Sequence, residues 1–148
     1  MTSFEDIKRD YETASAPKKR KRVKRRRMKT LVVVGTSGVA VSIVGYQLRN
    51  PLNKNIHWAE KQRMKDLFKK AVANESAPLA VRTLTFVRWY PLRSRPFDEG
   101  DNLNASFKWF RDAACEWLGL PNDGPSCGVT FAYEDHLSDD FGVTVRFA

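Results

Sequence analysis

Cysteine is scarce in this sequence. Only Cys115 and Cys127 occur among 148 residues, and they lie near tryptophan, glycine and proline rather than in a repeated pattern. Two such residues make neither a disulfide framework nor a metal-binding cysteine pair. The sequence therefore argues against a disulfide-stapled secreted domain and predicts reduced cysteines inside a cell.

Long uncharged runs are scarce as well, and the longest candidate is LVVVGTSGVAVSIVGYQL, 18 residues from Leu31 to Leu48. This length is the lower limit for a membrane-spanning helix, and the run follows a polybasic segment, as a positive-inside anchor would. However, Gly35 to Gly38 interrupt it, and its many Val and Ile residues favour strands. Two strands joined by a turn are the preferred interpretation. A membrane anchor at residues 31–48 is the alternative.

Basic residues outnumber acidic ones, and nearly all of the excess comes from one segment. The net charge is +9, and residues 18–29 alone contribute ten positive charges, so the last 119 residues are nearly neutral. Residues 1–29 are expected to be a disordered basic tail, because like charges repel and bury nothing. The run resembles a nuclear-import signal, but we favour an arm that binds nucleic-acid phosphates by counterion release. The expected contacts of this arm are Lys18, Lys19, Arg20, Lys21, Arg22, Lys24, Arg25, Arg26 and Arg27.

The remaining residues, 30–148, are enough for one domain with one core. Apolar residues at helical spacing predict helices within 57–75 and 102–119, the second ending at Gly119. Segments 81–90, 129–135 and 141–147 are typical of strands. Together they predict an α+β fold in the order β-α-β-α-β-β, with a single mainly antiparallel sheet and two packing helices.

An acidic loop precedes the second predicted helix. Asp98, Glu99 and Asp101 fall within four positions. Capping and the helix macrodipole account for one or two acids, but not for three, nor for Asp123 after the helix. Clustered carboxylates repel unless a cation intervenes, and Mg²⁺ prefers oxygen ligands. A metal there would activate water and stabilise a phosphodiester transition state, with Lys108 nearby to neutralise phosphate. Capping and metal binding both remain open on these grounds.

Two ordered segments resemble the RusA-like Holliday junction resolvases, most closely their phage-borne relatives. LRNPLNKNIHWAEKQRMK resembles the family's N-terminal signature, a strand ending in Pro-x-Asn and a His-Trp that opens a basic helix. The second segment is an Asp-Asn-Leu sequence followed by a helix and a loop. Its residues are Asp101, Asn102, Leu103, Lys108, Arg111, Asp112 and Asp123. The resemblance covers roughly residues 40–148.

This resemblance implies a Mg²⁺-dependent, homodimeric endonuclease that cuts branched DNA in recombination and repair. The family motif is Asp-x-Asp-Asn, a helical Lys and a later Asp. By position, Asp101 is the second Asp, Glu99 stands in place of the first, Lys108 is the basic residue and Asp123 the later acid. The implied metal ligands are therefore Glu99, Asp101 and Asp123, with Asp98 as a substitute for Glu99.

The sequence also departs from the family pattern. Glu99 adds a methylene to a metal ligand, and Lys108 follows Asp101 by seven residues where the bacterial form has four. A noncatalytic DNA-binding relative is therefore the alternative within the family. Arg93 and Arg95, in the loop before the acids, are expected to contact phosphates. Three tryptophans, Trp58, Trp109 and Trp117, are expected to be packed, and the protein is expected in the cytoplasm with the nucleoid.

Overall fold

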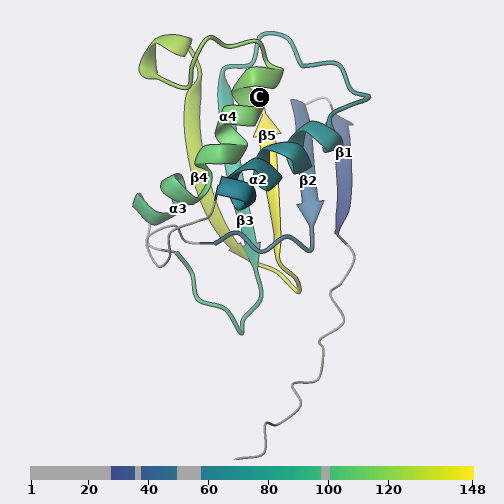
Figure 1. The fold of residues 1–148 in the computed structure, drawn as a ribbon, viewed down its shortest axis with the longest axis vertical. Helices are drawn as coiled ribbons and strands as arrows, with labels where there is room; N and C mark the ends of the chain where they lie inside the picture. Colours follow the sequence, from purple (N-terminus) through teal and green to yellow (C-terminus); the bar gives the residue numbers. More distant parts are fainter. Residues whose placement is uncertain (1–27, 36–37, 50–57, 98–100) are drawn as a thin grey trace, which may run out of the picture.

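The computed structural model of the chain describes residues 28–35, 38–49, 58–97 and 101–148. Within them, five strands form one sheet, and helices pack against it (Figure 1). The strands are β1 (Lys29–Gly35), β2 (Gly38–Val44), β3 (Thr83–Tyr90), β4 (Thr130–Leu137) and β5 (Gly142–Phe147). The helices are α2 (Trp58–Ala71), α3 (Asp101–Ser106), α4 (Lys108–Trp117) and the short 3₁₀ helix η1 (Pro125–Cys127). The predicted α+β class is confirmed.

The first apolar run is a hairpin of two strands. β1 and β2 pair antiparallel, from Lys29 opposite Val44 to Gly35 opposite Gly38. Gly38 has a φ of +128°, and a Cβ there would lie 2.0 Å from the carbonyl oxygen of Phe147, so only glycine fits. The strand interpretation is therefore confirmed for the described residues. In that part of the chain, no helix is long and apolar enough to cross a membrane.

The first strand of the hairpin begins just before residue 30, where the predicted domain starts. Lys29 already belongs to β1, and Met28 packs against the core. The boundary at residue 30 stays a prediction, and β1 begins one residue before it. The expected tail up to residue 27 lies outside the described residues.

The strand order in the sheet is β1-β2-β5-β3-β4. β5 pairs antiparallel with β2 on one side and with β3 on the other, whereas β3 and β4 are parallel. The predicted β-α-β-α-β-β order counted one strand before the first helix, whereas the structure has two, as the strand–turn–strand interpretation of the first apolar run predicts. The last two strands are consecutive in sequence but not adjacent in the sheet, because β5 inserts at its centre. The sheet is mainly antiparallel, as predicted.

The sheet packs one face against α2 and α4 (Figure 1). Side chains alternate between the faces of a strand, so every second residue of the central strands enters the core. On α2, Met64 and Phe68 are buried, as the predicted apolar stripe requires. Strand residues that face the core are Val41, Ile43, Leu84, Phe86, Val143, Val145 and Phe147. Residues of the other alternation in the hairpin, Leu31, Val33 and Val44, are exposed.

The second predicted helix is divided at Phe107 into α3 and α4. The Ser106 hydroxyl donates to the carbonyl oxygen of Asn102 at 2.6 Å, a bond that bends helices. Gly119 ends α4 as predicted, with a φ of +71°. The amide of Leu120 bonds to the carbonyl of Cys115 and that of Gly119 to Glu116, which is a Schellman motif.

Candidate functional site

Arg111 is the centre of a polar cluster between α3, α4 and β4. Its Nε donates to Asp123 Oδ2 at 2.9 Å, and its Nη1 donates to Asn104 Oδ1 at 2.6 Å. The same Nη1 donates to the hydroxyl of Tyr133 on β4. One guanidinium therefore ties a helix, a loop and a strand together, using the fixed fork of donors that arginine provides.

Lys108 adds a second positive charge to this cluster. Its Nζ lies 3.9 Å from Asp123 Oδ2 and 3.6 Å from Asp112 Oδ1. The side chain is 47% exposed, so the ammonium remains accessible to a ligand. Lys108 and Asp123, two of the predicted catalytic residues, are thus brought together. Asp112 is the i+4 partner of Lys108, as expected for an ion pair along one helix face.

The electrostatics of the cluster keep Asp123 ionised. Partial burial raises the pKa of Asp123, but its hydrogen bond to Arg111 and the charges of Arg111 and Lys108 outweigh burial, so the pKa falls below 3.8. For Tyr133, burial raises the pKa more than Arg111 lowers it. At neutral pH the cluster therefore contains an aspartate anion and a protonated phenol.

The other predicted metal ligands are only partly described. Asp101 is the first residue of α3, whereas Asp98 and Glu99 lie outside the described residues. Among the residues that the structure describes, no three of His, Cys, Asp or Glu are grouped so as to hold a metal. Asp123 offers the oxygen chemistry that suits Mg²⁺, and its side chain is 29% exposed. A metal on Asp123 would compete with Lys108 and Arg111, and the full ligand set remains a prediction.

A buried ion pair lies two residues further along β4, and the sequence patterns did not predict it. Arg88 of β3 and Asp135 of β4 are opposite each other in register, and their side chains are 2% and 11% exposed. Nη1 of Arg88 lies 3.0 and 3.1 Å from the two carboxylate oxygens. The guanidinium carbon is 3.7 Å from the ring centroid of Phe97 and 4.6 Å from that of Tyr90. The sequence signal that could have revealed this pair is strand alternation, which places Arg88 on the same face of β3 as Leu84 and Phe86.

This pair anchors the loop that leads to the acidic segment. Both terminal nitrogens of Arg88 donate to the carbonyl oxygen of Arg95 at 3.2 Å. The backbone amide of Phe97 donates to Asp135 Oδ2 at 2.8 Å. Phe97 is the last residue described before the acids, so the chain enters the acidic segment from a fixed point.

The remaining candidates are distributed around this region. Arg93 and Arg95 are exposed in the loop after β3, which leaves both available to phosphates. Trp58 is 71% exposed, so its predicted packing is wrong. Trp109 and Trp117 pack against the core as expected. The arm residues 18–27 lie outside the described residues.

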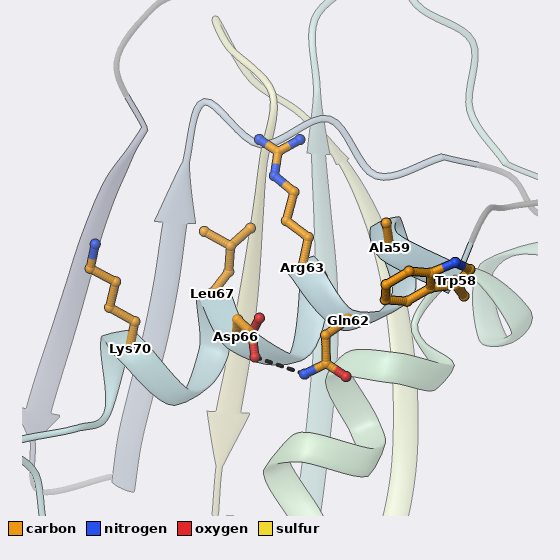
Figure 2. Close-up of a pocket in the computed structure, with 7 residues that line it drawn as sticks. All are labelled: Trp58, Ala59, Gln62, Arg63, Asp66, Leu67 and Lys70. Carbon is orange, nitrogen blue, oxygen red and sulfur yellow. Dashed lines mark hydrogen bonds between the residues drawn. The ribbon is translucent and has the colours of Figure 1, made fainter.

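A surface pocket of about 280 Å³ lies elsewhere, on α2 (Figure 2). The hydrogen bond drawn there runs from Gln62 Nε2 to Asp66 Oδ1, at 2.8 Å. The lining residues are Trp58, Ala59, Gln62, Arg63, Asp66, Leu67 and Lys70. None of the predicted catalytic residues lines it, so the Arg111 cluster is the better candidate site.

No protein-family model matches the chain, and no curated protein matches it significantly. A function is therefore inferred from the residues of the site and their geometry.

Proposed function

We propose that the protein is a RusA-like, Mg²⁺-dependent endonuclease that cuts branched DNA, such as Holliday junctions, in recombination and repair. The observation that supports this most is the approach of Lys108 to Asp123, at 3.9 Å, from a helix and the loop that follows it. Asn104 connects the same cluster to α3, which begins at Asp101. Lys108 and Asp123, which the family motif separates in sequence, therefore both lie near Arg111.

In this proposal Asp101 and Asp123 hold the metal together with Glu99 or Asp98. Mg²⁺ bound there would supply an activated water and stabilise charge on the phosphodiester. Lys108 neutralises the phosphate through its exposed ammonium. Arg111 acts as a positioning residue, because its hydrogen bond keeps the Asp123 carboxylate oriented and ionised.

The substrate contacts follow from charge. Arg93 and Arg95 lie in the loop before the acids and would hold phosphates near the site. The basic arm adds affinity that does not depend on sequence. A homodimer would present two such sites to the two strands that a junction resolvase must cut.

The decisive experiment is cleavage of a four-way DNA junction in Mg²⁺. Asp101→Asn should reduce cleavage by at least about 100-fold, because loss of metal-site partners alone costs about 10- to 100-fold. Asp139→Asn is the matched control, since Asp139 is exposed between β4 and β5. Equal cleavage by wild type and Asp101→Asn would remove Asp101 from the mechanism.

A second candidate is a noncatalytic DNA-binding relative of the same fold. It is favoured by the hydrogen bond that already occupies Asp123 Oδ2 and by Glu99 in place of an aspartate. Junction binding without cleavage by the wild type would select this candidate.

The basic arm has its own test. Because β1 begins at Lys29, a truncation should remove residues 1–27 and leave the strand intact. The truncated protein should bind DNA with a flatter dependence on salt concentration, by about one unit of slope for each phosphate that the arm neutralises. An unchanged slope would exclude the arm from binding.

A further inference from the structure

Lysines of α2 face α4 in a regular series. Lys69 Nζ lies 3.1 Å from Glu116, and Lys65 Nζ, one turn earlier, lies 3.9 Å from Asp112. One further turn earlier the series reaches Lys61, whose Nζ lies 4.9 Å from the ring centroid of Trp109. Two positions of the series thus face an acid, and the third faces an indole.

Positive charge accumulates at this third position. Nζ of Lys65 and Lys108 lie 5.6 and 5.7 Å from the same Trp109 centroid, so three ammonium groups lie within 5.7 Å of one ring centroid. Asp112 serves both Lys65 and Lys108. Among the described residues, Lys61 has no carboxylate partner. The series is therefore compensated at the Lys69 end and positively charged at the Lys61 end, where Trp109 also contacts Lys108, whose Nζ lies 3.9 Å from Asp123 Oδ2.

Protein stability does not explain this arrangement. Lys61 and Lys65 are like charges at i and i+4 of one helix, which is destabilising, and an exposed cation–π contact offsets this only in part. An anion placed among the three ammonium groups would remove the repulsion. The Trp109 ring already contacts lysine ammonium groups, so we assign it the role of holding them rather than of stacking on a base.

We propose that Lys61, Lys65 and Lys108 form a binding track for the phosphates of a DNA strand, which it guides to Asp123. The inference rests on the proposed function, because Lys108 belongs to both the track and the site. A nucleic-acid backbone fits better than a single small anion, because the charges are spread over two helices. The contacts are to phosphate, so binding along the track does not depend on base sequence.

The test compares lysines of one helix. Affinities for a four-way junction and a linear duplex are measured over a series of salt concentrations, with EDTA in place of Mg²⁺. The full-length proteins compared are wild type, Lys61→Gln/Lys65→Gln and Lys70→Gln. Lys70 is the control because it is exposed, lies on the pocket side of α2 (Figure 2) and loses the same charge per substitution. The double variant Lys69→Gln/Lys70→Gln loses two charges and is therefore the matched control for Lys61→Gln/Lys65→Gln.

Lys61→Gln/Lys65→Gln should lower the slope of log affinity against log salt by about two, and Lys70→Gln should lower it by less than about one. Binding to the junction should weaken by roughly tenfold at fixed salt, equally for two junctions of different sequence. Thermal unfolding should change little, since the partly exposed contacts of Lys61 and Lys65 contribute little to stability.

Slopes of Lys61→Gln/Lys65→Gln equal to those of Lys69→Gln/Lys70→Gln would overturn the track. If the wild type nevertheless cuts the junction, the proposed function stands while the track fails. A wild type that does not cut but binds with a Lys61- and Lys65-dependent slope would support the track and refute the nuclease. Binding to anionic vesicles with no binding to DNA would overturn the track.

Discussion

Two arginine–aspartate pairs, both involving β4 or the loop before it, use the same chemistry in opposite surroundings. Arg88 and Asp135 are 2% and 11% exposed, and the Arg88 guanidinium lies against two aromatic rings. Arg111 and Asp123 are 15% and 29% exposed, and the neighbouring Lys108 is 47% exposed. The difference shows how one domain can use an ion pair either to fix the backbone or to present charge.

The surroundings decide what each pair can do. A buried pair cannot exchange its partners for water, so breaking it leaves a desolvated charge. A partly exposed pair can exchange a partner for solvent or a ligand at much lower cost. We therefore expect the Arg88 pair to be structural and the Arg111 cluster to be functional.

The largest effect is expected from breaking the buried pair on one side. Asp135→Leu leaves Arg88 buried without its counter-charge and should lower the free energy of unfolding by about 3–5 kcal/mol. Urea unfolding followed by fluorescence measures this. The double variant Arg88→Met/Asp135→Leu should recover most of the loss, because no buried charge remains. A loss below about 1 kcal/mol for Asp135→Leu would contradict a structural role.

An intermediate effect is expected at Arg111. Arg111→Met removes the charge-assisted hydrogen bond to Asp123 and should destabilise the protein at pH 7 by about 1.5–3 kcal/mol, the usual contribution of a hydrogen bond to a charged group. It should also raise the pKa of Asp123, which NMR titration of the carboxyl carbon measures.

The Arg111 effect should depend on pH with a definite sign. The pKa of Asp123 is lowered below its ordinary value of 3.8 in the folded protein. The stability gained from this is fully present above pH 3.8 and is lost as pH falls through the folded pKa. The difference in unfolding free energy between wild type and Arg111→Met should therefore shrink below pH 3.8. A constant difference would show that Asp123 is not involved.

The smallest effect on stability is expected at Lys108. Lys108→Met breaks two partly exposed ion pairs and one cation–π contact with Trp109, and should change the unfolding free energy by no more than about 1 kcal/mol. Junction cleavage should nevertheless fall sharply, because the ammonium that neutralises phosphate is gone. Lys70→Met, on α2, should change neither quantity. Loss of stability in step with loss of cleavage would assign Lys108 a structural role instead.

Local patterns predicted much of the fold. The apolar stripe on α2, the two strands in the first apolar run and the stop at Gly119 all depend on residues close in sequence, and each is confirmed. The break at Phe107 was missed because it depends on a side-chain hydrogen bond from Ser106 that spacing does not reveal. The position of β5 was missed because strand order depends on contacts between distant segments.

The site was predicted less completely for the same reason. Lys108 and Asp123 could be paired because they belong to one helix and its following loop. Arg88 and Asp135 meet only because β3 and β4 are parallel neighbours, a register that no short motif contains. The three lysines around Trp109 likewise need the packing of α2 on α4.

The central position of β5 has a consequence for how the chain folds. Phe147 pairs with Val39 on one side and Leu84 on the other, so β5 joins the hairpin to the parallel pair. Until residues 142–147 have been synthesised, neither half can complete the sheet, and both keep an open edge. Contacts this distant in sequence slow folding, and open strand edges favour aggregation. Assembly of the sheet should therefore be a cooperative step that waits for residues 142–147.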